Sequence, residues 1–143
     1  MSKMNVGFIG LGKLGLPCAL AINNKGHQVW GYDINPQVKE ILDTKVLPYR
    51  EEGSPELLQT HTINFGSVQE VVNNSEIIFV PIQTPHDYKY EGCTRIPQER
   101  DDFNYAYLKS GIQALEKGGF EVITTKVAQE QVANYINTHD VKV

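Results

Sequence analysis

Three glycines near the start of the chain, Gly10, Gly12 and Gly15, follow a short apolar run with the spacing G-x-G-x-x-G. In this pattern the first glycine permits a tight turn and the second lets a phosphate group come close to the backbone. The third allows the following helix to pack tightly on a sheet. The free N–H groups and the dipole at the start of that helix would face the phosphates. The spacing therefore indicates binding of a pyrophosphate by backbone groups.

The residues around these glycines have the order that dinucleotide binding requires. A strand-like run over residues 4–9 precedes the glycines, and a helix-like run over residues 13–25 follows them. A second predicted strand, residues 29–32, ends at Asp33, about 20 residues beyond the glycines. A carboxylate there can accept hydrogen bonds from both ribose hydroxyls and repels a 2′-phosphate, so these residues predict NAD rather than NADP. A glycine-rich turn in a fold that binds nothing is the alternative, and it leaves the acid and its spacing unexplained.

The apolar pattern of the remaining chain predicts strands that alternate with helices. Strands are expected over residues 4–9, 29–32, 62–65, 76–82 and 120–125, and residues 140–143 look like the start of a sixth. Helices are expected over residues 13–25, from Pro36, after Ser67, and over 103–117 and 128–139. This order predicts one α/β domain over residues 1–143, a Rossmann-type doubly wound parallel sheet.

The first helix is expected to cover the sheet with a stripe of four side chains at helical spacing, Leu14, Cys18, Ala21 and Ile22. Cys18 is then a core residue, whereas Cys93 lies in a loop where nothing marks it as a nucleophile. Two cysteines without paired spacing are typical of a reduced, cytoplasmic protein.

Composition argues against several classes of partner. The net charge of −4 and the lack of a basic patch argue against nucleic acid. No apolar stretch reaches the length of a membrane span, and the four histidines lack metal-ligand spacing, so neither a membrane nor a metal is expected. The segment 86–101, which contains Tyr88, Tyr90, Arg95 and Arg100, is interpreted as a solvated surface loop rather than a nucleotide or partner contact.

Several spaced motifs together resemble the UDP-glucose/GDP-mannose dehydrogenase family, the nucleotide-sugar 6-dehydrogenases. The family's opening G-x-G-x-x-G-L-P matches residues 10–17, and its G-x-D-x-x-P matches residues 31–36. Its P-x-x-E-x-G loop appears at residues 48–53, and E-L-L follows at 56–58. Its V-x-T-P corresponds to residues 82–85, and its D-L-x-Y is similar to residues 102–105. The resemblance covers most of the first 115 residues.

The resemblance implies an NAD-binding domain of an enzyme that oxidises the C6 alcohol of a UDP-sugar or GDP-sugar to a uronate with two NAD. It implies a cofactor site formed by Gly10, Leu11, Gly12, Lys13, Leu14, Gly15, Asp33, Gln83 and Thr84. Thr84 would also position the nicotinamide and a catalytic water; its alternative interpretation is a Thr-Pro strand terminator. A homo-oligomer is possible.

Two departures from the family pattern limit what this chain is expected to do. The family's K-S-T-V-P-P-G-T is replaced by T-T-K-V-A-Q-E-Q at residues 124–131, and neither cysteine lies in a G-F-G-G-x-C-x-P-K-D motif. Oxidation to the acid level needs a thiolate, so the chain is expected to be inactive without the missing substrate domain. Two alternatives stay open. One is a stand-alone NAD-binding sensor or regulatory module, and the other is the cofactor domain of a β-hydroxyacid or 6-phosphogluconate-type dehydrogenase.

Overall fold

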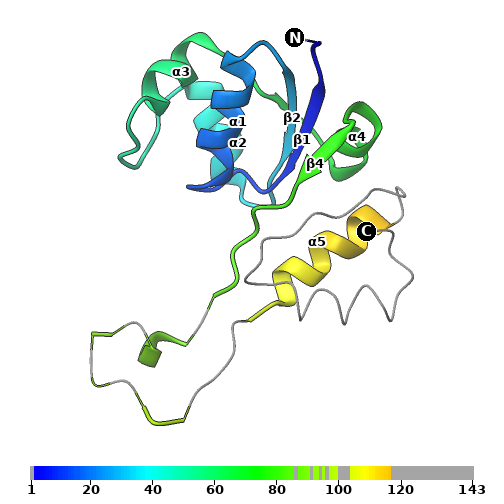
Figure 1. Cartoon of the computed structure of the whole chain (residues 1–143). Helices are drawn as coiled ribbons and strands as arrows, with labels where there is room; N and C mark the ends of the chain where they lie inside the picture. The colour runs from blue at the N-terminus through cyan, green and yellow to red at the C-terminus, as the bar shows by residue number, and fades with distance from the viewer. Residues whose placement is uncertain are drawn as a thin grey trace.

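A computed structural model of the chain describes residues 2–85, 87–90, 92–93, 95, 97–99 and 104–116. Within these residues helices and strands alternate along most of the chain, as predicted (Figure 1). The elements are β1 (Asn5–Ile9), α1 (Gly15–Asn24), β2 (Gln28–Tyr32), α2 (Pro36–Thr44), α3 (Ser54–Thr60), β3 (Asn64–Phe65), α4 (Val68–Asn74), β4 (Ile77–Phe79), the 3₁₀ helix η1 (Tyr88–Tyr90) and α5 (Ala106–Glu116). The strand predicted over 120–125, the helix over 128–139 and the start of a sixth strand lie outside the described residues.

The strands form a parallel sheet in the order β3-β2-β1-β4. Val6 pairs with Val29 on one side of β1 and with Ile77 on the other, so β1 is central. Because the chain leaves β1 first toward β3 and later toward β4, the order reverses at β1, which is the topology of a doubly wound sheet. The predicted α/β class is confirmed in this part of the chain.

Two of the strands are shorter than predicted. The sequence predicts strands over residues 62–65 and 76–82, whereas β3 has two residues and β4 has three. At the end of β4 the Ile82 N–H bonds back to the Val80 carbonyl at 2.9 Å, and Pro81 between them has no N–H to donate. The ladder therefore stops before the apolar run does.

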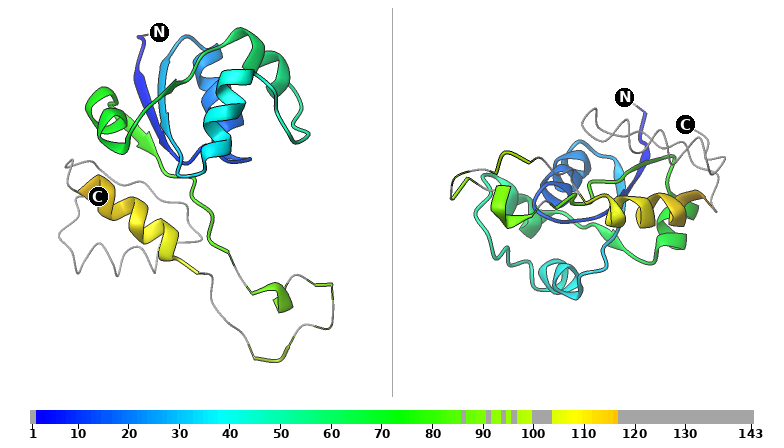
Figure 2. Two further views of the ribbon diagram at one scale, coloured as in Figure 1. Left: turned by 180° about the vertical axis from the view of Figure 1, so that it is seen from behind. Right: turned by 90° about the horizontal axis from the view of Figure 1, so that it is seen from below.

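Helices cover both faces of the sheet. Helices α1, α2 and α3 lie on one face, and α4 and α5 lie on the other (Figures 1 and 2). Side chains of β1 alternate between the two layers: Val6 and Phe8 belong to the core under α1 and α2, whereas Ile9 belongs to the core under α4 and α5. Gly7 faces α4, where an added Cβ would lie 2.6 Å from the Ser75 Oγ. Each face of the sheet thus has its own core.

The predicted face of the first helix is wrong. Gly15, Leu16, Ala19 and Leu20 are the buried residues of α1. Leu14 precedes the helix and is 67% exposed, Cys18 and Ala21 are exposed, and Ile22 packs only at the margin of the core. The prediction counted the stripe from Leu14, whereas the stripe of Leu16, Ala19 and Leu20 also has helical spacing and is the one that faces the sheet, on the same side as the closely packed Gly15. Cys18 is therefore a surface residue and not a core residue.

The remaining helices largely follow their sequence signals. Asn35 caps α2 by accepting a hydrogen bond from the Gln37 N–H, and the predicted inner face of Val38, Ile41 and Leu42 is buried. In α5 the predicted residues Leu108, Ile112 and Leu115 are also buried. None of the helices in the described ranges is long and apolar enough to cross a membrane.

The capping box predicted at Ser67 is present at the start of α4. The Ser67 hydroxyl accepts a hydrogen bond from the Glu70 N–H, and the Glu70 carboxylate accepts one from the Ser67 N–H at 2.7 Å. The hydrogen bond from the Ser67 N–H to the charged carboxylate, with a smaller effect of the Ser67 hydroxyl, holds the pKa of Glu70 below its usual range.

Candidate functional site at the carboxyl end of the sheet

The first and third glycines of the predicted motif are required by the turn itself. Gly10 has φ of +111°, a conformation that L side chains rarely adopt, and its N–H donates to the Tyr32 carbonyl at 2.8 Å. At Gly15 an added Cβ would lie 2.2 Å from the Gly10 carbonyl oxygen and 2.9 Å from Cγ of Pro81. A side chain at either position would displace backbone, so the fold itself requires a glycine at both positions.

Gly12 differs from its two neighbours because nothing in the fold requires a glycine there. It is exposed, its φ is not positive, and an added Cβ would meet no atom within 4 Å among the described residues. Its carbonyl accepts the first hydrogen bond of α1, from the Leu16 N–H at 3.0 Å. The open side of the turn is thus bare backbone at the start of a helix, which is the arrangement that a phosphate group needs.

Asp33 lies where the sequence predicts it, at the end of β2 and against the glycine turn. One carboxylate oxygen accepts a hydrogen bond from the Leu11 N–H at 2.7 Å, and the other accepts one from the Asn35 N–H at 2.8 Å. The half-buried carboxylate therefore joins the turn to the start of α2. Because each carboxylate oxygen has more than one lone pair, both can still accept a hydroxyl hydrogen bond.

The other predicted residues of the turn divide into one buried and two exposed side chains. Leu11 is 1% exposed and packs against Gly31, where an added Cβ would lie 2.5 Å from a Leu11 methyl. Its N–H is donated to Asp33, so Leu11 shapes the turn and offers a ligand neither its side chain nor its N–H. Lys13 and Leu14 are exposed, and the Lys13 ammonium lies 5.9 Å from the centre of the Tyr49 ring.

Tyr49 is a neighbour of the turn that the spacing of motifs did not predict. Its ring is half-buried, and its hydroxyl oxygen is buried without a hydrogen-bond partner in the part of the chain that the structure describes. Burial, with a smaller effect of the Glu51 carboxylate, raises the pKa of the Tyr49 hydroxyl. The one available signal was an aromatic residue within the loop 48–53 that resembles the family pattern.

The segment after β4 reaches the glycine turn through Pro81. The Pro81 carbonyl oxygen lies 3.2 Å from the place where a Cβ of Gly10 would be. Gln83 is exposed and Thr84 is half-buried, and neither makes a hydrogen bond with the described residues. On the far side, α5 packs on Ile82 at Gly111, where an added Cβ would lie 2.4 Å from the Ile82 Cδ1. This contact of Gly111 was not predicted either.

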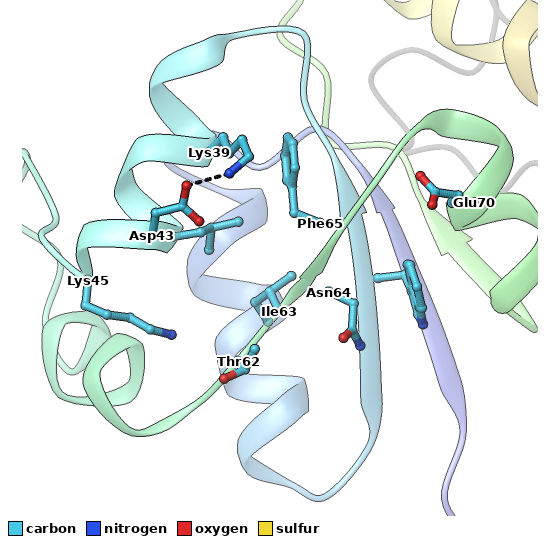
Figure 3. Close-up of a pocket in the computed structure, with 10 residues that line it drawn as sticks. Lys39, Asp43, Lys45, Thr62, Ile63, Asn64, Phe65 and Glu70 are labelled. Carbon is cyan, nitrogen blue, oxygen red and sulfur yellow. Dashed lines mark hydrogen bonds and ion pairs between the residues drawn. The ribbon is translucent and has the colours of Figure 1, made fainter.

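A groove of about 570 Å³ lies elsewhere, along α2 and β3 (Figure 3). Lys39 and Asp43 form an ion pair on its α2 side, and Lys45 reaches from the end of that helix. Its lining residues are Trp30, Lys39, Leu42, Asp43, Lys45, Thr62, Ile63, Asn64, Phe65 and Glu70. None of the predicted site residues lines this groove, so the groove is separate from the site that the motifs predict.

The chain is similar to curated proteins of greater length, one of which is named as a nucleotide-sugar dehydrogenase. UDP-N-acetyl-D-mannosamine dehydrogenase of Pyrococcus horikoshii is 24% identical over 132 residues, which are 87% of this chain and 29% of that protein. Protein CapL of Staphylococcus aureus is 32% identical over 84 residues, which are 58% of this chain and 19% of that protein. The chain thus spans less than a third of the length of these curated relatives.

The fold matches solved structures of the same kind. GDP-mannose dehydrogenase of Pseudomonas aeruginosa aligns with a TM-score of 0.71 and 18% identity over 97% of this chain and 33% of that one. UDP-glucose dehydrogenase of the hyperthermophilic archaeon Pyrobaculum islandicum aligns with a TM-score of 0.67 and 24% identity over 82% of this chain and 26% of that one. Residues 4–117 match the family model described as the UDP-glucose/GDP-mannose dehydrogenase family, NAD binding domain. The chain therefore belongs to the UDP-glucose/GDP-mannose dehydrogenase family and corresponds to its NAD-binding domain.

Proposed function

We propose that residues 1–143 are the cofactor domain of a nucleotide-sugar 6-dehydrogenase and hold NAD at the glycine turn. The observation that carries the proposal is the contrast among the three glycines. The fold itself requires glycine at positions 10 and 15, because a side chain there would be strained or would clash. No such constraint applies to Gly12, which is open to solvent. A bare backbone position between a strand and a helix fits the close approach of a pyrophosphate.

Each part of the proposed site has a physical role. The backbone N–H groups at the start of α1 would hold the pyrophosphate, with Gly10, Gly12 and Gly15 shaping the turn and Leu11, Lys13 and Leu14 completing it. The Asp33 carboxylate would accept hydrogen bonds from the ribose hydroxyls and repel a 2′-phosphate. Gln83 and Thr84 would lie beside the nicotinamide, and Thr84 would orient a water there. Bound NAD supplies the hydride acceptor.

The whole reaction is proposed for a longer protein, with this chain as its cofactor domain. Oxidation of a sugar C6 alcohol to a uronate, on a UDP-sugar or GDP-sugar, requires a thiolate for the second step. Cys18 is exposed on the outer side of α1, and Cys93 is exposed after η1. Neither lies in the cysteine motif of the family, so we expect no turnover by this chain alone. A cytoplasmic location and a homo-oligomeric state belong to the same proposal.

Calorimetric titration of the 143-residue chain with NAD and NADP tests the proposal. We expect NAD to bind with a Kd between micromolar and millimolar, and NADP to bind at least about tenfold more weakly because of repulsion by Asp33. Asp33→Asn should weaken NAD binding by about tenfold and reduce the difference in Kd between NAD and NADP. Asp43→Asn, an exposed acid on α2, is the matched control and should bind NAD as the wild type does. Failure of the wild-type chain to bind either cofactor overturns the proposal.

A further inference from the structure

Lys13 differs from the other residues of the glycine turn because its side chain carries a charge. The lysine is exposed and forms no ion pair with any residue that the structure describes. Its ammonium lies 5.9 Å from the centre of the Tyr49 ring, within the range at which a cation is attracted to an aromatic face. The charge is therefore placed beside the turn without being neutralised there.

Tyr49 is suited to hold this charge in place. Its ring is half-buried and its hydroxyl oxygen is fully enclosed, so the surrounding residues restrict how the ring can turn. A tyrosine phenol is neutral at physiological pH, and burial and Glu51 raise the pKa of this hydroxyl further, so the ring keeps an attractive face for a cation. A fixed ring reduces the number of positions that the flexible lysine side chain occupies.

The acidic groups near the turn make a full positive charge useful for binding an anion there. The Asp33 carboxylate is bonded to the Leu11 N–H, so an acid lies against a turn that is proposed to receive an anionic group, and the Glu51 carboxylate acts on the nearby Tyr49. The N–H groups at a helix start offer only about half a positive charge. The Lys13 ammonium adds a full positive charge to this partial charge at the turn.

We propose that Tyr49 positions the Lys13 ammonium beside the opening at Gly12, where the ammonium contacts the pyrophosphate of the bound dinucleotide. This inference rests on the proposed function, since it assigns a residue to the same NAD site. Lys13 acts on the ligand directly, and Tyr49 acts through Lys13. The contact adds a charge-assisted hydrogen bond to those that the backbone supplies.

The test compares variants of the 143-residue chain by calorimetric titration with NAD and with adenosine, which lacks the pyrophosphate. Lys13→Met should weaken NAD by about five- to tenfold, the loss of a charged contact at an exposed site, and leave adenosine binding unchanged. Lys13→Arg should bind NAD within about twofold of the wild type. Lys25→Met removes the same charge at the opposite end of α1 and should change neither ligand.

Salt and the aromatic ring give two further readouts. Because Lys13→Met removes one cation from the contact, NAD binding by this variant should depend less steeply on salt than binding by the wild type. Tyr49→Leu should weaken NAD by about two- to threefold, whereas Tyr49→Phe keeps the ring and should bind as the wild type does. A Lys13→Met chain that binds NAD as tightly as wild type overturns the inference and leaves NAD binding by the domain intact. A wild-type chain that binds no NAD overturns the proposed function as well.

Discussion

The glycine turn and the segment after β4 lie next to each other at the carboxyl end of the sheet, but they are held in different ways. The turn is fixed by hydrogen bonds from Gly10 to Tyr32 and from Leu11 to Asp33, and by the close packing of Gly15. The segment with Gln83 and Thr84 is joined to the described residues by few such contacts, among them the bond from the Asn104 N–H to the Pro85 carbonyl at 2.7 Å.

This difference separates the two halves of the proposed site. The half expected to hold phosphate and ribose forms largely within one βαβ unit, with Pro81 packed against Gly10 and Gly15, so residues close in sequence determine most of its shape. The half expected to lie at the nicotinamide depends on what packs against the end of β4, including α5 at Gly111. The phosphate and ribose half is therefore formed before a ligand binds. Four substitutions test how far this half differs from the nicotinamide half in stability and in NAD binding.

Gly15→Ala should have the largest effect, on the stability of the fold. The new Cβ would lie 2.2 Å from the Gly10 carbonyl oxygen, so backbone must move. We expect the free energy of unfolding to fall by about 2–4 kcal/mol, measured by urea denaturation. An unchanged denaturation midpoint would show that the turn is not held as tightly as its contacts indicate.

Gly12→Ala should separate binding from folding within the same turn. Its Cβ meets nothing within 4 Å, and its backbone conformation suits alanine, so the unfolding midpoint should stay close to that of wild type. The added methyl group occupies the side from which a phosphate approaches, so the Kd for NAD should rise at least about tenfold. Tight NAD binding by this variant would contradict the placement of the pyrophosphate.

Ser67→Ala should affect the support of β4 without affecting the glycine turn, because α4 leads into that strand. Loss of the cap at the start of α4 should lower the free energy of unfolding by about 1 kcal/mol, with the NAD Kd of the folded chain unchanged. The pKa of Glu70 is lowered in the folded state, so its contribution to stability is present above the unfolded pKa and is lost as pH falls through the folded value. Ser67→Ala keeps the Ser67 backbone N–H, which is the larger cause of the lowered pKa, so variant and wild type should both lose that contribution as pH falls. The stability difference between them should shrink below about pH 4 only by the smaller part that the Ser67 hydroxyl supplies, which denaturation curves across pH would show.

Thr84→Val should have the smallest effect of the four. The side chain makes no hydrogen bond with the described residues, so replacing its hydroxyl should leave the unfolding midpoint unchanged. If Thr84 lies beside the nicotinamide, the NAD Kd should rise by about two- to threefold, the size of one solvent-accessible hydrogen bond. Titration with adenosine is the control, because adenosine lacks the nicotinamide and should bind both chains equally.

The sequence predicted those parts of the molecule that local chemistry controls. The glycine turn, Asp33, the inner face of α2 and the capping box at Ser67 all follow from short-range spacing, and all are present. The predicted face of α1 was wrong because two apolar stripes of this helix have helical spacing, and the prediction chose the one that begins at Leu14 instead of Leu16, Ala19 and Leu20. Apolar spacing alone does not distinguish the two stripes, whereas the close packing of Gly15 against Gly10 places the buried one on the sheet. The early end of β4 has a local cause in Pro81, which the length of the apolar run concealed.

Contacts between distant segments were beyond prediction from spacing. Leu11 fits against Gly31, Lys13 lies over the Tyr49 ring, and α5 approaches Ile82 at Gly111. Each of these contacts depends on how separate elements pack, and no short motif encodes it. The proposed role of Lys13 arises from one such contact, which is why the motif alone indicated only backbone chemistry at that position.

The most direct test of NAD binding at the glycine turn is a map of backbone amide chemical shifts in the 143-residue chain during titration with NAD. The largest shifts should fall on residues 11–15 and on Asp33 and Asn35, while residues 62–65, which line the groove of Figure 3, should change little. Shifts centred on that groove, or a saturating titration that leaves residues 11–15 unchanged, would contradict the placement of NAD at the glycine turn.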